Sequence, residues 1–128
     1  MSGVEKMAKP KRTFSGRGAT NVKITVLKTP SDWEGFKEPP IKAKYSGPCP
    51  IFEVGQEFIV NAQRPQIPLS TTSTKGSGFC PYAWEAIFPA CWEYYEAGTN
   101  AQWYENDKVM IACCPDGVRP VIFKLEWI

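Results

Sequence analysis

The sequence contains no histidine among its 128 residues. Ser-His-Asp and Cys-His catalytic systems, His-ligated zinc, the facial triad of non-haem iron and proximal-His haem all need an imidazole, so these classes are excluded. The chain also lacks an apolar run of about 18 residues, which a membrane-spanning helix needs. Residues 1–20 lack the apolar core of a signal peptide. We therefore expect a cytoplasmic protein without a membrane span.

The length and the 43% hydrophobic content are typical of one globular domain. Residues 1–20 differ from the rest because they carry five basic residues against the single acid Glu5. The basic residues are Lys6, Lys9, Lys11, Arg12 and Arg17. We expect a basic N-terminal arm over 1–20 and one folded domain over 21–128. No strip of aromatic and basic side chains accompanies the arm, so we do not expect a nucleic-acid partner.

The first core element is predicted just after the arm. Val22, Ile24 and Val26 alternate with polar residues, which is typical of a half-buried strand, although the apolar Leu27 breaks the alternation. A second strand is expected within 51–62, where a glycine separates two short apolar pieces. Both strands are candidates for one small sheet.

The C-terminal region predicts a hairpin. Apolar strands over 108–113 and 120–127 flank a Cys-Pro-Asp-Gly turn at 114–117. Two other segments, the proline-rich 29–50 and the Ser/Thr-rich 63–78, are expected to be loops, because proline does not fit a central strand and the second segment is rich in turn residues.

One long helix is predicted over 80–97. Pro81 suits a first turn, Gly98 ends the pattern, and Pro89 should bend or split the helix because it lacks an amide hydrogen. The residues expected to form the buried stripe are Trp84, Ile87, Phe88, Cys91, Trp92 and Tyr95. The predicted fold is therefore α+β, a small antiparallel sheet with one main, proline-kinked helix packed on it.

Cysteine placement is the most informative chemical feature. Three of the five cysteines, Cys49, Cys80 and Cys114, directly precede proline, whereas composition alone would give about half of one. Proline fixes φ and removes an amide, which suits the rigid turn around a metal-ligating thiolate, and ferredoxin-type cluster motifs end in Cys-Pro. Cys113 adjoins Cys114. Each of these cysteines lies at an element boundary, so we predict a metal site of Cys49, Cys80, Cys113 and Cys114.

Because the candidate ligands are all sulfur donors and no histidine is present, two kinds of metal site remain, an iron–sulfur cluster and a cysteine-only zinc site. Structural zinc sites use paired Cys-x(2–4)-Cys motifs, which this chain lacks, and two adjacent cysteines are hard to fit around one tetrahedral ion. A cubane is larger and can accept neighbouring cysteines at its corners. The pattern therefore favours a [4Fe–4S] cluster, with zinc as the alternative.

A purely structural interpretation of the cysteines stays open. Free cysteine behaves as a small hydrophobic residue, so Cys113 and Cys114 could fill the core. Neighbouring side chains of a strand point to opposite faces, so both reach one site only if the turn begins at Cys113. Cys91 lies on the helix stripe and is expected in the core. Arg119 is expected to bind the cofactor by neutralising its charge, with a carboxylate as the alternative ligand. Asp116 is an ordinary turn former, and a simple pair between Asp116 and Arg119 stays open.

The aromatic residues exceed what one helix can bury. Tyr94, Trp103 and Tyr104 fall outside the predicted stripe, so part of this aromatic surface is expected to contact another protein. Together with the basic arm, it would hold a larger subunit.

Several blocks together are similar to a family of small uncharacterised bacterial and archaeal proteins. The blocks are 22–26, Gly-Pro-Cys-Pro at 47–50, Gly-Gln-Glu-Phe at 55–58, Gly-Phe-Cys at 78–80 before Ala83-Trp84, and the Cys-Cys-Pro-Asp-Gly-Val-Arg-Pro-Val-Ile-Phe block at 113–123. The resemblance covers 22–128 and implies a shared fold and shared cysteines but no reaction. The arm and the 68–77 loop depart from the family.

The sequence thus favours a small [4Fe–4S]-binding accessory subunit of a larger, anaerobic enzyme complex, in electron transfer or structural support. Three alternatives stay open: a cysteine-ligated zinc module, a small enzyme with Cys114 or Cys80 as nucleophile beside Arg119, and a structural binding module without metal.

Overall fold

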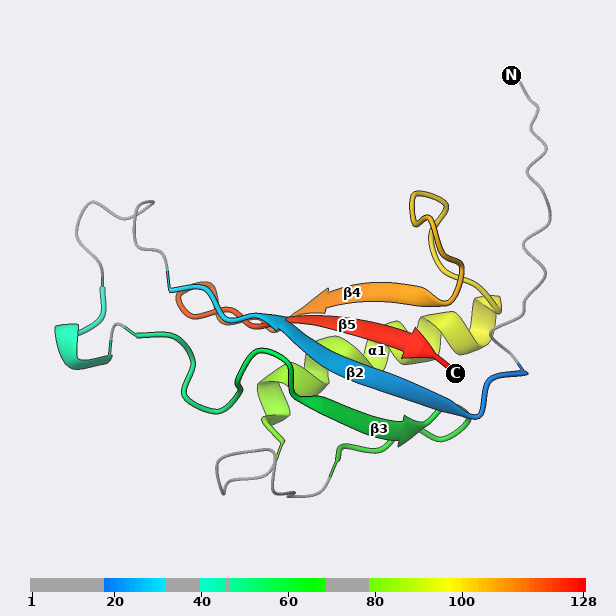
Figure 1. Cartoon of the computed structure of the whole chain (residues 1–128), viewed down its shortest axis with the longest axis horizontal. Coiled ribbons are helices and arrows are strands. Elements are labelled where there is room, and N and C mark those ends of the chain that lie inside the picture. Colours follow the sequence, from blue (N-terminus) through cyan, green and yellow to red (C-terminus); the bar gives the residue numbers. More distant parts are fainter. Residues whose placement is uncertain (1–17, 32–39, 46, 69–78) are drawn as a thin grey trace.

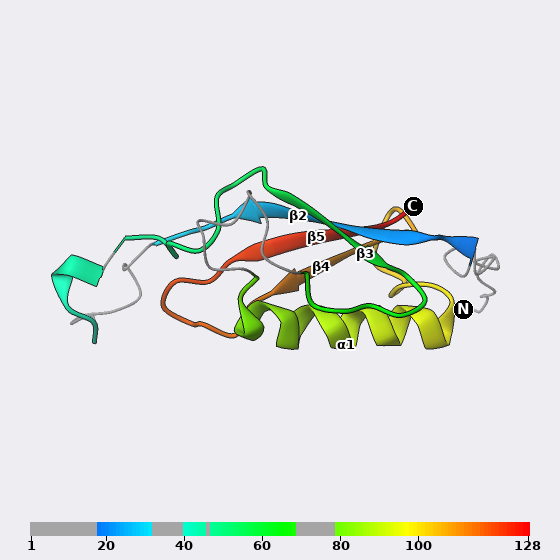
Figure 2. The same ribbon diagram turned by 90° about the horizontal axis from the view of Figure 1, so that it is seen from below.

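A computed structural model of the chain describes residues 18–31, 40–45, 47–68 and 79–128. Four antiparallel strands form one sheet in the order β3-β2-β5-β4, and the helix α1 covers one face of it (Figures 1 and 2). The elements are β2 (Asn21–Lys28), the 3-10 helix η2 (Ala43–Tyr45), β3 (Glu57–Asn61), α1 (Pro81–Ala97), β4 (Val109–Cys113) and β5 (Ile122–Trp127). The predicted α+β architecture is confirmed.

Strand alternation places one apolar set of side chains beneath the sheet. Val22, Ile24 and Val26 of β2 are fully buried, and Phe123 and Leu125 of the neighbouring β5 are equally buried. The apolar Leu27 lies where the β2–β5 register shifts, so that two residues of β2 face one residue of β5. This irregularity is a bulge, and it explains why Leu27 interrupts the alternation.

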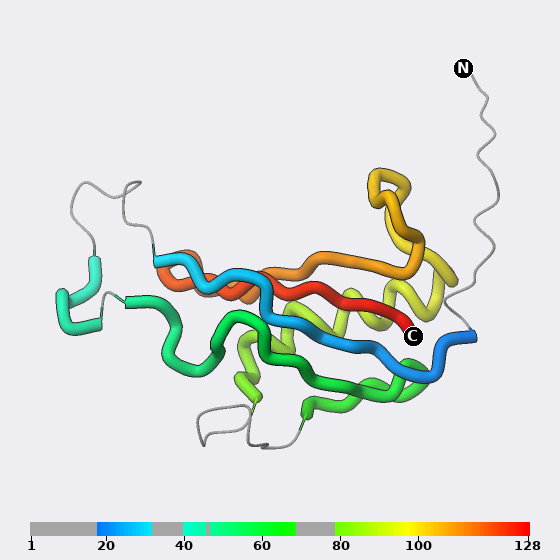
Figure 3. Tube along the Cα trace, in the orientation of Figure 1, coloured from blue at the N-terminus to red at the C-terminus, as the bar shows by residue number. Residues whose placement is uncertain are grey.

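The predicted C-terminal hairpin is also confirmed. β4 and β5 pair from Val109 opposite Glu126 to Cys113 opposite Ile122. The backbone just before β2 is bound to the end of the chain, because the N–H of Thr20 donates to the carbonyl of Ile128 at 2.8 Å. Figure 3 shows this start of the described chain beside the C-terminus. The remainder of the predicted arm, 1–17, lies outside the described residues, as do 32–39, 46 and 69–78 of the two predicted loops.

The helix begins and ends where the sequence predicts. Pro81 occupies its first turn after the N-cap Cys80, and Gly98 ends it with φ 78°, donating its N–H to the carbonyl of Tyr94. The helix continues through Pro89, so it is not split. Pro89 has no N–H to donate to the carbonyl of Glu85. Both residues face solvent, so water can bind this carbonyl instead.

The buried stripe of α1 differs from the predicted one. The residues of α1 that are buried are Ala83, Ile87, Cys91 and Tyr94. Phe88, Trp92 and Tyr95, which were expected in the core, are exposed, and Tyr94, which was expected outside it, is 1% exposed. The ring of Tyr94 stacks on Trp127 of β5 at a centroid distance of 3.8 Å. This contact packs the buried side of α1 against β5.

An aromatic cluster closes the core at the N-terminal end of α1. Phe52, Phe58, Phe79 and Phe123 meet with centroid distances between 4.9 and 6.2 Å, mostly edge to face. These arrangements are the ones that aromatic quadrupoles favour.

Within the described ranges, no helix combines the length and the apolar character that a membrane span requires.

Candidate functional site

A pocket of about 160 Å³ lies beside this aromatic cluster, where three segments meet. The segments are the loop at 49–52, the first turn of α1, and the turn between β4 and β5. The lining residues are Cys49, Pro50, Ile51, Phe52, Cys80, Tyr82, Ala83, Cys114, Asp116, Arg119 and Val121. A water molecule takes about 30 Å³ in the liquid, so the pocket has space for roughly five water-sized groups.

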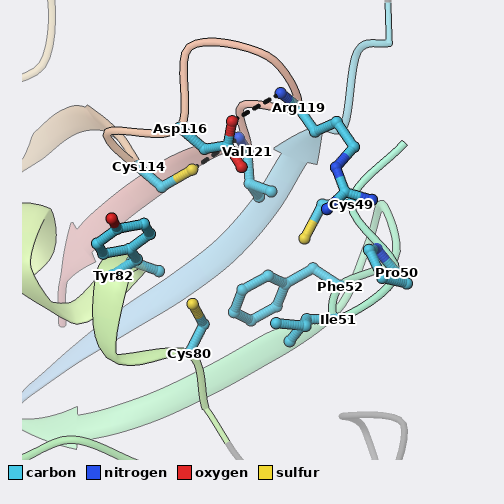
Figure 4. Close-up of a pocket in the computed structure, with 11 residues that line it drawn as sticks. Cys49, Pro50, Ile51, Phe52, Cys80, Tyr82, Cys114, Asp116, Arg119 and Val121 are labelled. Atoms are coloured by element: carbon cyan, nitrogen blue, oxygen red, sulfur yellow. Dashed lines mark hydrogen bonds between the residues drawn. The ribbon is translucent and has the colours of Figure 1, made fainter. Parts of the chain in front are cut away.

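Three cysteines line this pocket, one from each segment. Figure 4 shows the sulfur atoms of Cys49, Cys80 and Cys114 directed into it. All three are the cysteines that precede proline in the sequence, and all three are free thiols. The turns that end β4 and begin α1 bring them together although they are distant in sequence.

Cys113 does not join them. It is the last residue of β4, paired with Ile122, and it is exposed because successive side chains of a strand point to opposite faces. Its sulfur lies 3.3 Å from the carbonyl oxygen of Cys114, to which the S–H donates. Partial desolvation, and secondly the neighbouring Cys114, raise the pKa of the Cys113 thiol. The turn begins after Cys113, so the two adjacent cysteines do not reach one site.

Cys114 is the most constrained of the three pocket cysteines. It is 8% exposed, and its Sγ accepts the backbone N–H of Val121 at 3.3 Å. Its own N–H donates to the carbonyl of Val121 at 3.0 Å. Backbone N–H groups directed at sulfur are one of the ways in which proteins tune iron–sulfur clusters.

Cys80 is the N-cap residue of α1, but its side chain makes no capping hydrogen bond. The amide groups of the first turn therefore have no side-chain acceptor at the N-cap. Cys80 is half-buried, and its side chain lines the pocket.

Asp116 and Arg119 complete the polar part of the pocket. The Oδ1 of Asp116 accepts the N–H of Arg119 at 3.0 Å and that of Val118 at 2.9 Å. These two hydrogen bonds, Arg119 first, lower the pKa of Asp116, so its carboxyl group stays charged. The guanidinium of Arg119 donates to the carbonyl of Tyr45 at 3.4 Å, and no ion pair joins it to Asp116 in the described part of the chain.

The spacing of these groups bears on which metal they could hold. Ligands of a single zinc ion lie close together, because Zn–S distances of about 2.3 Å put the sulfur atoms about 3.8 Å apart. Within the described residues, no three cysteine or acidic side chains form such a group. Soft sulfur donors are ligands of iron–sulfur clusters as well as of zinc.

The fifth cysteine, Cys91, is 1% exposed in the core, as predicted. Desolvation raises the pKa of its thiol from the ordinary value of 9.0 to about 12. A raised pKa means that stability is complete below about pH 9 and falls as the pH rises toward 12, because only the unfolded thiol ionises there.

We therefore expect urea unfolding to show a pH-dependent difference between the wild type and Cys91→Ala. Between about pH 8 and pH 10 the stability of the wild type should fall by about 1.4 kcal/mol relative to the variant, since one thiol proton is lost only on unfolding. Parallel pH profiles for the two proteins would show that Cys91 ionises equally in both states.

Two of the residues predicted to lie outside the core do so. Trp103 is 82% exposed. Tyr104 is half-buried, and its hydroxyl accepts the N–H of Ile111 at 2.9 Å, which protects the edge strand β4 from other strands. Trp92 on α1 is also exposed, at 54%.

Comparisons with protein-family models, with curated proteins and with solved structures find no match to this chain.

Proposed function

We propose that the protein binds a [4Fe–4S] cluster in the three-cysteine pocket, as a small accessory subunit of a larger, anaerobic enzyme complex. Cys49, Cys80 and Cys114 would hold the cluster, which would serve electron transfer or structural support. The observation that carries the proposal is that these three cysteines, each from a different segment, line one pocket. No histidine is present to direct the site toward another metal.

The surroundings of the sulfurs support the same proposal. Ile51, Phe52 and Val121 give the pocket apolar walls, which keep water from the cluster and influence its potential. The N–H of Val121 donates to Cys114 Sγ. Arg119 supplies a positive charge at the pocket, and this charge would offset the negative charge of a thiolate-ligated cluster.

The exposed aromatic side chains support the role of a subunit. Aromatic residues are enriched at protein interfaces, where they bury large areas at low entropic cost. Trp92 and Tyr95 form one ring pair on α1, at 6.0 Å, and both are exposed. All charged residues of α1 are acidic, namely Glu85, Glu93 and Glu96. A basic and partly apolar surface on the larger subunit would complement this face.

Anaerobic reconstitution with ferrous iron and sulfide tests the cluster. The wild type should become brown and contain iron and sulfide in equal amounts. Single Cys→Ala changes at 49, 80 and 114 should each abolish most of the bound iron, since a cluster with fewer thiolates is easily lost.

Cys91→Ala is the matched control, because it removes a buried sulfur outside the pocket and should leave the iron content unchanged. A colourless protein with stoichiometric zinc would support the zinc alternative instead of the cluster. Absence of both metals after reconstitution would overturn the proposal.

A further inference from the structure

The pocket offers a cubane only three thiolates, whereas a [4Fe–4S] cluster has four iron corners to ligate. Cys113 is directed away from it, because β4 extends through this residue and the strand alternation places its side chain on the outer face. Its S–H donates to the carbonyl of Cys114. A fourth protein ligand would therefore have to come from another residue that lines the pocket.

Asp116 is the lining residue with a suitable donor. It lies two positions after Cys114, on the same turn, and Figure 4 shows both side chains at one side of the pocket. Oδ1 of Asp116 accepts two backbone N–H groups, which orients the carboxylate and leaves Oδ2 for a further partner. Arg119 donates instead to the carbonyl of Tyr45.

We infer that Asp116, rather than Cys113, supplies the fourth ligand of the cluster, through Oδ2. This inference rests on the proposed function, since it concerns the same pocket. A carboxylate is a harder donor than a thiolate and holds a sulfide-bound iron less firmly. The iron at Asp116 should therefore be the one that is released first.

Release of that iron has a defined stoichiometry. With ferricyanide as oxidant, [4Fe–4S]²⁺ gives [3Fe–4S]⁺, one Fe²⁺ and one electron, and the electron reduces ferricyanide to ferrocyanide. The three thiolates keep their bonds, and only the Asp116 carboxylate loses its metal. The product has one unpaired spin, so electron paramagnetic resonance detects it.

The test is an anaerobic ferricyanide titration of the reconstituted full chain, followed by paramagnetic resonance and iron analysis. The wild type and Cys113→Ala should both show the [3Fe–4S]⁺ signal and lose about one quarter of their iron. Asp116→Cys should retain its iron under the same conditions, because a fourth thiolate closes the site. Asp116→Asn keeps an oxygen that accepts both N–H groups but loses the negative charge. Its cluster should therefore release iron at a lower ferricyanide concentration than the cluster of the wild type.

The outcomes separate this inference from the proposed function. Loss of the cluster in Cys113→Ala, or a wild type as resistant as Asp116→Cys, would show that Cys113 is the ligand and overturn the inference while the cluster stands. Equal ferricyanide sensitivity of Asp116→Asn and the wild type would also overturn it. Failure of every form to take up iron and sulfide would overturn both.

Discussion

Replacing Phe123 by alanine is expected to lower the free energy of unfolding by about 3–5 kcal/mol, the usual loss for a fully buried aromatic side chain. Phe123 has no exposed surface and lies in β5, one of the two inner strands. Its ring contacts Phe52 at a centroid distance of 5.3 Å and Phe79 at 6.2 Å. Because several segments meet at this ring, the cavity cannot collapse easily, and denaturant titration should show the loss.

Lys124→Ala is the control for this prediction, since the change lies in the same strand on the other face. Its ammonium group lies 3.4 Å from Glu126 at the surface, and such pairs contribute about 1 kcal/mol or less. Similar losses in the two variants would mean that the aromatic cluster does not organise the core.

Tyr94→Ala should destabilise the protein by about 3–5 kcal/mol as well, because the buried ring stacks on Trp127 and fixes α1 against β5. Tyr94→Phe separates the two parts of this contact. It keeps the ring and removes only the hydroxyl, which donates to the carbonyl of Asp107 at 2.5 Å. The expected loss for the Phe variant is about 1–2 kcal/mol.

The two Tyr94 variants are compared by thermal and denaturant unfolding. Equal losses in both would place the whole contribution in the hydroxyl, and negligible losses in both would mean that the rotation of α1 is set elsewhere. The comparison also tests the correction to the predicted helix stripe, since Trp92→Ala, on the exposed side, should change stability by less than about 1 kcal/mol.

The helix stripe shows why a periodic pattern can identify an element without orienting it. Spacings of three and four residues connect Trp84, Phe88, Trp92 and Tyr95 as well as the set that is actually buried. The smaller Ala83 and Cys91 lie on the buried side and allow a close approach to the sheet. Tyr94 adds a ring that matches Trp127 across the interface, and a partner from a distant strand is not visible in the helix sequence itself.

The cysteines show the same division. Their Cys-Pro pattern indicates a shared chemical role, and the three cysteines that carry it line one pocket. Whether the fourth predicted ligand, Cys113, reaches the pocket depended on where the turn begins. Pairing of Cys113 with Ile122 extends β4 by the one residue that directs this side chain away. The place of Asp116 in the pocket was not predicted, because the sequence of a turn does not show which cavity its side chains line.

The amino-acid sequence alone determined the features that neighbours along the chain control: the alternation of β2, the C-terminal hairpin, and the limits of α1 at Pro81 and Gly98. The tertiary structure decided which helix side is buried and which sulfurs share a pocket. The reason is physical, since backbone preferences act over a few residues, whereas burial is settled by the fit between surfaces that are far apart in sequence.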